Sequence, residues 1–279
     1  MPKTLYVSDL DGTLLDRRDR LPEYTVRTLN ALLSKGMLFT FATARSWHSA
    51  HIVTEGLSPS LPWIVHNGAM LCDGRTGERT DQVTFTDPQR REILDRCEAL
   101  GLWPLCYGIL NGEEKVFYLE DETRHPGMEH YIVSRKGDKR LTPVKTREEL
   151  LQGGTYYFTF IHDREPLTPL WEQIKDLPWL NLTFQQELYR DEYWLEITPK
   201  EATKACAALR LKERLGCDRL VAFGDAMNDL PLFEAADESC AVENAMPPVR
   251  EAATRVIGSS EEGGVARFLM EIFEREGAI

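Results

Sequence analysis

The sequence lacks long apolar runs and paired-cysteine motifs. No stretch approaches the roughly 20 apolar residues that a helix needs to cross a bilayer. The apolar segment from Leu5 to Leu15 contains Asp9 and Asp11, which the core of a secretory signal would not carry. Its six cysteines form no C-x-x-C pair and are too sparse to staple 279 residues. We therefore expect a cytoplasmic protein with reduced thiols.

Positive charge is also scarce. The 33 Lys and Arg are outnumbered by 45 Asp and Glu, and the formal net charge is −12. Such a field repels nucleic acids and anionic membranes. We therefore expect a small-molecule partner, with no nucleic acid and no membrane, and the sequence does not indicate the oligomeric state. The content of 42% hydrophobic and 28% charged residues is that of an ordinary globular protein.

Both ends of the chain alternate short apolar runs with amphipathic stretches. This alternation predicts an α/β fold with a Rossmann-like parallel-sheet core. The predicted strands include 5–8, 37–42, 63–65, 193–198, 220–223 and 255–257, and the predicted helices include 23–35, 203–215, 229–235 and 265–274. The helix at 23–35 is the safest of these, because apolar residues recur at steps of three and four and Gly36 follows as a stop.

The middle of the chain has a different character. Its apolar runs are richer in aromatic residues, and Asn111-Gly112 between two of them predicts a hairpin turn. Asp87 and Pro88 are suited to the N-cap and first position of a helix that runs to Leu100. We expect an inserted α+β cap domain at 81–190, with the catalytic core formed by 1–80 and 191–279.

Two carboxylates follow the first predicted strand. Asp9 and Asp11 belong to the run Asp9-Leu10-Asp11-Gly12-Thr13-Leu14 at the carboxyl end of that strand, where ligands bind in parallel sheets. On an extended segment, side chains two residues apart point the same way. Two like charges this close are costly unless a cation or a shared proton intervenes. A bound divalent cation is the simplest way to offset this repulsion.

A second acidic run ends the strand at 220–223. It reads Gly224-Asp225-Ala226-Met227-Asn228-Asp229 and adds two carboxylates and an amide. Oxygen ligands of this kind suit Mg²⁺, which retains water and substrate phosphate oxygens in its other positions. Either run alone is equally compatible with an acidic turn.

Groups that bind phosphate are predicted near the same sheet edge. Thr43 and Arg45 end the strand at 37–42, and Lys204 opens the helix at 203–215. A hydroxyl, a guanidinium and an ammonium beside carboxylates indicate a phosphate-binding site rather than ordinary exposed polar residues.

In this order, the motifs Asp9-x-Asp11-Gly12-Thr13, Thr43-Ala44-Arg45, Lys204 and Gly224-Asp225-x-x-Asn228-Asp229 resemble the four motifs of the haloacid dehalogenase superfamily. The insertion, preceded by Asn67-Gly68-Ala69, resembles the Cof-like phosphatase branch with a type IIB α/β cap. The likeness covers the whole chain.

The resemblance implies that Asp9 is the nucleophile and that Asp11 is the general acid and base. It implies Mg²⁺ as cofactor, with Asp9, Asp11, Asp225 and Asp229 as its site. The substrate phosphate would be bound by residues that follow the strand ends: Thr43, Ala44, Arg45, Lys204 and Asn228. A covalent carboxylate intermediate divides a difficult displacement into two steps, which supports these roles on chemical grounds.

Four positions depart from the family pattern, where glycine is more usual: Ala44, Glu201, Ala205 and Glu243. They leave every catalytic group in place but put the shape of the substrate entrance in question. We interpret the protein as a Mg²⁺-dependent phosphatase of small phosphorylated metabolites, with sugar phosphates favoured by the resemblance. The alternatives are a phosphomutase, a phospho-aspartate receiver and a binding protein on the same fold.

Overall fold

The computed structural model describes residues 2–120, 124–187 and 190–276. Two compact units make up the chain: Met1–Gln82 with Thr203–Ile279, and Val83–Ala202. We call them the core unit and the inserted unit. Within the described residues, no helix combines the length and apolar character that a bilayer crossing requires.

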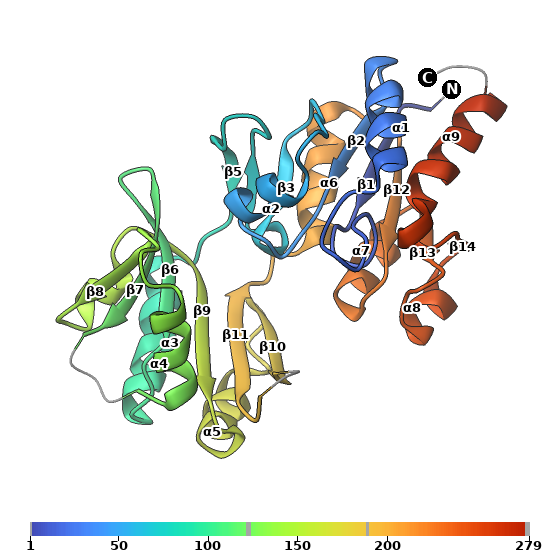
Figure 1. Cartoon of the computed structure of the whole chain (residues 1–279). Helices are drawn as coiled ribbons and strands as arrows, with labels where there is room; N and C mark the ends of the chain where they lie inside the picture. The colour runs from blue at the N-terminus through green and yellow to red at the C-terminus, as the bar shows by residue number, and fades with distance from the viewer. Residues whose placement is uncertain (1, 121–123, 188–189, 277–279) are drawn as a thin grey trace. The chain divides into compact units, whose positions relative to one another are not determined.

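The core unit contains a parallel sheet with the order β14-β13-β12-β1-β2 among the described residues (Figure 1). Its strands are β1 (Thr4–Ser8), β2 (Leu38–Phe41), β12 (Arg219–Gly224), β13 (Glu238–Val242) and β14 (Arg255–Ile257). Consecutive residues of β1 and β12 are buried, as expected of parallel strands covered on both faces. The predicted α/β core is confirmed.

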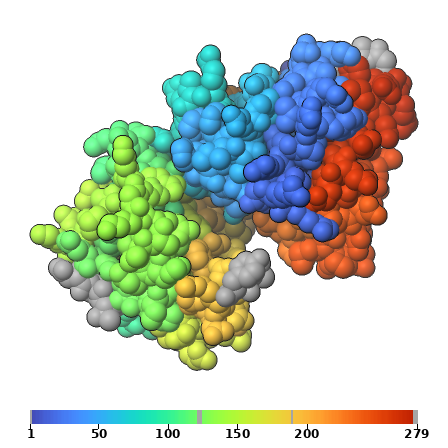
Figure 2. All heavy atoms as spheres, in the orientation of Figure 1, coloured from blue at the N-terminus to red at the C-terminus, as the bar shows by residue number. Residues whose placement is uncertain are grey.

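Helices surround this sheet. They are α1 (Glu23–Ser34), α2 (Trp47–Val53), α6 (Lys204–Leu215), α7 (Leu230–Ala235), α8 (Pro247–Ala252) and α9 (Gly264–Glu276), with short 3₁₀ turns η1 (His66–Gly68), η3 (Met227–Asp229) and η4 (Ser260–Glu262). Figure 2 shows the N-terminal part of the core unit, in blue, packed beside the C-terminal part, in red, in agreement with the contact between α1 and α9. The two ends of the chain therefore build one folding unit.

The prediction for residues 63–65 was only partly correct. These residues form β3 (Trp63–Val65), but β3 pairs antiparallel with β4 (Met70–Cys72), which pairs with β5 (Arg79–Gln82). One isolated bridge, from Ala42 to Ile64, continues the parallel arrangement beyond β2. A short apolar run does not specify its partner, and here the turn at Asn67 and Gly68 sends the chain back on itself.

The inserted unit is an α+β fold around a second sheet, with the order β10-β11-β9-β6-β7-β8 among the described residues. Its strands are β6 (Leu105–Leu110), β7 (Glu113–Leu119), β8 (Leu141–Val144), β9 (Gly154–His162), β10 (Leu180–Gln186) and β11 (Tyr193–Pro199). Its helices are α3 (Asp87–Ala99), α4 (Pro126–Ser134) and α5 (Arg164–Ile174), with the 3₁₀ turn η2 (Glu148–Leu151). Pairing is antiparallel except between β7 and β8.

Two local features of this unit bear on the sequence predictions. Asn111 and Gly112 both have positive φ, 51° and 83°, and join the antiparallel strands β6 and β7, as the hairpin prediction required. The helix after residue 86 is capped by Thr86 rather than Asp87, because the Thr86 N–H donates to Oε1 of Gln89. Asp87 and Pro88 are therefore the first two helical residues.

The strand at 193–198 was assigned to the wrong sheet. β11 pairs with β9 and β10, so it belongs to the inserted unit, which continues to Ala202. The apolar side chains Leu195 and Ile197 are fully buried in the core of that unit together with Phe158 and Phe160. Alternation along a strand shows that one face is buried but does not show against which domain.

Candidate active site

The two acidic runs lie at the carboxyl ends of neighbouring strands. β1 pairs with β12 in parallel register, with Ser8 opposite Phe223, so Asp9 and Asp225 leave the sheet side by side. The strand order reverses here, because β2 lies on one side of β1 while β12, β13 and β14 lie on the other. Open parallel sheets bind ligands at such a switch point. The topology therefore explains why these two runs meet.

Lys204 joins two of the carboxylates. Its ammonium donates to Oδ1 of Asp9 at 2.6 Å and to Oδ1 of Asp229 at 2.8 Å. All three side chains are buried, with exposed fractions of 3%, 6% and 0%. Lys204 is the first residue of α6, whose N-cap Thr203 accepts the N–H of Cys206. The start of this helix thus fixes where the ammonium enters the site.

Asp229 has both carboxylate oxygens engaged within the chain. While Oδ1 accepts from Lys204, Oδ2 accepts the backbone N–H groups of Asp225 at 3.0 Å and Ala226 at 3.1 Å. Charge-assisted bonds of this kind are short and strong. Asp229 therefore holds the turn that presents Asp225 and also holds Lys204 in place.

Asp225 is held from the opposite side by the first acidic run. Thr13 donates its hydroxyl to Oδ1 of Asp225 at 2.8 Å. Gly12, at φ +75°, passes so close that a Cβ there would lie 2.3 Å from Oδ2 of Asp225. Only glycine combines this conformation with this approach.

The cluster carries more negative charge than its one ammonium balances. Burial raises the pKa of Asp9 to about 8, since it outweighs the opposing effect of Lys204 and acts together with the charge of Asp229. Burial also raises the pKa of Asp225. For Lys204, burial alone would lower the pKa, but Asp9 and Asp229 outweigh it and raise the pKa above its ordinary value.

This donor set fits a divalent cation. Asp9, Asp225 and Asp229 each offer a carboxylate oxygen within 4.8 Å of the others. All the donors are oxygen atoms, which hard cations such as Mg²⁺ prefer. A cation would also offset the negative charge of Asp229, which adds to burial in raising the pKa of Asp9 and Asp225.

Arg45 and Asp11 form a separate pair beside this cluster. The Nε of Arg45 lies 3.0 Å from both carboxylate oxygens of Asp11, and Nη2 lies 2.5 Å from Oδ1. The Asp11 side chain is 45% exposed, whereas that of Arg45 is 21% exposed. The hydrogen bond to Asp11 raises the pKa of Arg45 further. The structure therefore brings Arg45 to Asp11, although both were predicted to face the reacting phosphate.

The other predicted phosphate-binding residues differ in their burial. Thr43 is fully buried, and its Oγ1 accepts the N–H of Arg45 at 3.1 Å. Ala44 and Asn228 are exposed. Of the four departures from the family pattern, Ala205 is buried, whereas Ala44, Glu201 and Glu243 are exposed.

Two residues support the site without having been assigned a role from the sequence. Thr13 holds Asp225, and Asn244 donates its side-chain amide to the carbonyl of Gly12 at 2.7 Å. The Oδ1 of Asn244 accepts the N–H of Ser260, so the loop that contains Asn244 is bound to the start of η4. Thr13 belongs to the same run as Asp9 and Asp11, so its position was a usable signal, and Asn244 directly follows Glu243, one of the four positions that depart from the family pattern.

The chain is similar to known proteins over nearly its whole length. A family model described as haloacid dehalogenase-like hydrolase matches residues 6–269. A 5-amino-6-(5-phospho-D-ribitylamino)uracil phosphatase of Bacillus subtilis is 26% identical over 275 residues, which cover 96% of this chain and 97% of the relative. An HMP-PP phosphatase of Yersinia enterocolitica is 25% identical over 266 residues, covering 94% and 92%.

The fold of the chain is also found in solved structures. A sugar phosphatase described as haloacid dehalogenase subclass IIB superposes with a TM-score of 0.67 over 99% of this chain and 100% of that one. It is 20% identical, so the likeness concerns the fold alone.

Proposed function

The chain belongs to the haloacid dehalogenase-like hydrolases and is a phosphoric monoester hydrolase of their Cof-like branch, and we propose that it hydrolyses small phosphorylated metabolites with Mg²⁺ as cofactor. The observation that carries this proposal is the cluster of Asp9, Asp225 and Asp229 at the switch point of the sheet, in which the Lys204 ammonium joins the buried Asp9 and Asp229.

Asp9 is the nucleophile in this proposal. One of its oxygens is fixed by Lys204, so the carboxylate has a single orientation when it attacks phosphorus. The attack forms an aspartyl phosphate and releases the alcohol of the substrate. Water then attacks the phosphorus of this intermediate, which frees inorganic phosphate and regenerates Asp9.

Asp11 is the proton-transfer group. It gives a proton to the departing alcohol oxygen and later removes one from the attacking water. Arg45 holds the Asp11 carboxylate by two hydrogen bonds, so it acts as a positioning residue in this proposal.

Lys204 and Thr43 bind the transferring phosphoryl group. Negative charge spreads over its peripheral oxygens during transfer, so an ammonium and a hydroxyl fixed in advance stabilise it. Ala44 and Asn228, both exposed, are proposed to border this group.

Asp9, Asp225 and the backbone carbonyl of Asp11 would hold Mg²⁺, and Asp229 would support the site. When bound, this ion neutralises phosphate charge and keeps nucleophile and phosphorus aligned. Asp229 contributes by holding Asp225 and Lys204, because its own oxygens already accept hydrogen bonds from the chain.

The substrate class is a small phosphate ester, with sugar phosphates proposed first. The two curated relatives act on a phosphorylated ribityl compound and on HMP-PP, so these two compounds and a set of sugar phosphates form the natural panel. The net charge of −12 supports a small-molecule substrate over a nucleic acid. The described cysteines are all free, which supports the proposed cytoplasmic location.

The test is phosphate release from such a panel, with Mg²⁺ and then with excess EDTA. We expect turnover of at least one metabolite that EDTA abolishes and Mg²⁺ restores. Asp9→Asn should lower kcat at least about a thousandfold, because the amide keeps the shape of the carboxylate but cannot attack phosphorus. Asp95→Asn, at an exposed ion pair with Arg147, is the control and should keep full activity.

Full turnover by chelated wild-type protein would refute the metal assignment. Substantial turnover by Asp9→Asn would refute the assignment of the nucleophile.

A further inference from the structure

The turn η1 has a left-handed backbone at three consecutive residues. His66, Asn67 and Gly68 have φ of 49°, 53° and 97°, and no other three successive residues in the described part of the chain share this feature. The left-handed conformation is unfavourable for residues other than glycine. Such strain persists only where surrounding contacts impose it, and it is concentrated at functional sites. The contacts of η1 therefore indicate what the strained backbone maintains.

Reversal of the chain alone does not require this backbone. Two-residue hairpin turns need positive φ at two positions and often contain Asn-Gly. Asn111 and Gly112 form a turn of this kind between β6 and β7, with φ of 51° and 83°. In η1 the same Asn-Gly pair is preceded by a third left-handed residue, His66. This additional residue exceeds what a connection between β3 and β4 needs.

One side of η1 is bonded to the segment that follows β2. The N–H of Asn67 donates to the carbonyl of Thr43 at 2.9 Å, and the N–H of His66 donates to the carbonyl of Arg45 at 3.0 Å. The N–H of Thr43 in turn donates to the carbonyl of Ile64 at 2.9 Å. The backbone of residues 43–45 is therefore fixed by η1 and by the end of β3.

The other side of η1 lies against the start of α6. A Cβ at Gly68 would lie 2.1 Å from the carbonyl oxygen of Thr203 and 2.9 Å from the backbone nitrogen of Lys204. Only a residue without a side chain permits this approach. Farther along α6, Arg210 donates Nη2 to the carbonyl of Gly68 at 3.3 Å and Nε to Oδ2 of Asp81 at 2.9 Å. The turn and the helix are thus held together at Gly68.

We propose that η1 is a positioning element of the active site, which sets the separation between Thr43 and Lys204. Gly68 and Arg210 act in it as positioning residues. This role rests on the proposed function, in which Thr43 and Lys204 bind the same phosphoryl group. Two groups that stabilise one transition state must be correctly spaced, and a misplacement of about 1 Å can lower the rate about a hundredfold. A strained turn that is bonded on both sides keeps this spacing.

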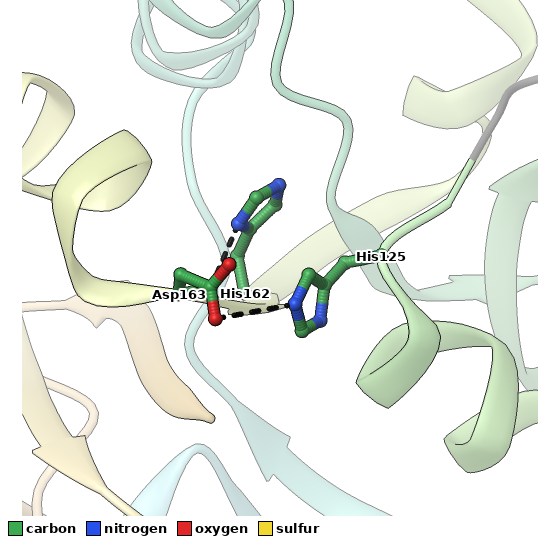
Figure 3. Close-up of side chains that lie close together, drawn as sticks. All are labelled: His125, His162 and Asp163. Atoms are coloured by element: carbon green, nitrogen blue, oxygen red, sulfur yellow. Dashed lines mark hydrogen bonds and ion pairs between the residues drawn. The ribbon is translucent and has the colours of Figure 1, made fainter. Parts of the chain in front are cut away.

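A group of side chains in the inserted unit supplies a control for lost stability. Figure 3 shows His125, His162 and Asp163 facing one another. Nδ1 of His125 accepts the N–H of Gly127 at 3.1 Å and so caps α4, and Nδ1 of His162 accepts the N–H of Asp163 at 2.8 Å, directly before α5. Because these contacts fasten helices of the inserted unit, His125→Ala should lower the melting temperature and leave kcat for p-nitrophenyl phosphate unchanged.

The first test compares crystal structures of Gly68→Ala and Gly112→Ala. Gly112 is the matched control, because it also follows an asparagine and has positive φ, +83°, but nothing lies within 4 Å of the place that a Cβ would occupy. Ordinary carbon contacts need about 3.5 Å, so in Gly68→Ala either Thr203 or the turn must move by about 1 Å. The separation of Thr43 and Lys204 should therefore change in Gly68→Ala and stay as in the wild type in Gly112→Ala.

The second test is steady-state hydrolysis of p-nitrophenyl phosphate, well below the melting temperatures of the variants. Gly68→Ala should lower kcat about 10- to 100-fold and change KM less than about threefold, since the spacing matters most in the transition state. Arg210→Met, which adds no atom to the turn, should lower kcat about 3- to 10-fold. Lys212→Met removes an ion pair with Asp237 from the same helix and should keep the wild-type kcat.

A double-mutant cycle shows whether Gly68 acts through the lysine. In a Lys204→Arg background, Gly68→Ala should lower kcat less than about threefold, because the group that it positions has already been altered. A general loss of stability would instead lower kcat by the same factor in both backgrounds.

The proposal is overturned if Gly68→Ala keeps the wild-type separation of Thr43 and Lys204, or if it keeps the wild-type kcat. Equal effects in the two backgrounds would also overturn it. If Gly68→Ala does not fold, an unchanged kcat in Arg210→Met overturns the proposal. A wild type that hydrolyses no ester would refute the proposed function instead, and the crystal structures would then decide the role of η1 by themselves.

Discussion

The guanidinium of Arg45 holds the carboxylate of Asp11 through Nε and Nη2, at 3.0 and 2.5 Å from Oδ1. Asp19 lies 3.5 Å from the same Nη2, and Ser49 accepts from Nη1 at 3.3 Å. Asp11, the proposed proton-transfer group, is thus held by the planar and permanently charged guanidinium of Arg45, which lies shortly before α2. This contact prevents free rotation of the Asp11 side chain.

Arg45→Met should lower kcat for p-nitrophenyl phosphate about 10- to 100-fold, because Asp11 loses the partner that positions it. Arg45→Lys should recover only part of this loss, since an ammonium cannot make the paired contacts of a guanidinium. Steady-state kinetics with wild type, both variants and Arg17→Met as an exposed control would measure the effect. An unchanged kcat in Arg45→Met would show that the contact has no part in turnover.

Mg²⁺ binding should release protons near neutral pH. Burial raises the pKa of Asp9 to about 8, so the metal-free protein retains a proton there between about pH 4 and pH 8. Because the folded state then binds more protons than the unfolded state, this group lowers stability as pH rises through that window. A divalent cation favours the ionised carboxylate, so binding expels the proton.

Titration calorimetry in buffers of different ionisation enthalpy measures this release. We expect up to about one proton at pH 6.5 and almost none at about pH 9, where Asp9 is already ionised. Asp9→Asn should show much less release at pH 6.5. Equal release by wild type at both pH values would contradict the proposed titration of Asp9.

Lys204→Met should destabilise the chain by about 3–5 kcal/mol, because it leaves the buried Asp229 carboxylate and Asp9 without their ammonium. Adding Asp229→Asn should recover about 1–3 kcal/mol of that loss, since the uncompensated charge of Asp229 is removed. Urea unfolding of the single and double variants in EDTA gives both values. Strict additivity of the two substitutions would show that the residues do not interact energetically.

Gly12→Ala should weaken Mg²⁺ binding and activity, because its Cβ would lie 2.3 Å from Oδ2 of Asp225. Gly36→Ala provides a matched control, since Gly36 also has positive φ, +95°, but nothing lies within 4 Å of the place that a Cβ would occupy there. Both variants should lose about 1–2 kcal/mol of stability from backbone strain. Mg²⁺ titration and thermal melts separate the two effects, and equal Mg²⁺ affinity in both variants would argue against the close approach.

Much of the core unit could be predicted from local patterns. Helix α1 extends from Glu23 to Ser34 against a predicted 23–35, and β14 coincides with the predicted 255–257. These segments have apolar residues at the period of their own secondary structure, so neighbouring residues alone were informative. The hairpin at Asn111 and Gly112 was predictable because few residues adopt positive φ readily.

Assignments that depend on a distant partner were less secure. The strand at 193–199 was recognised, but its sheet was not, because alternating side chains fit either domain equally well. Likewise, the acidic runs at Asp9 and Asp225 predicted a cation site at one sheet edge. The hydrogen bond from Arg45 to Asp11 was not predictable, because it depends on how the turn after β2 folds.

The sequence by itself determined the chemical groups of this protein and the strand ends that carry them, since residue type and local periodicity are properties of short segments. Only the tertiary structure decided which of these groups lie in contact with one another. Lys204 reaches Asp9 across 195 residues of chain, and His125 meets His162 at the end of β9, because sheet pairing and helix starts bring these positions together. Such contacts depend on packing summed over the whole chain, and no local pattern encodes them.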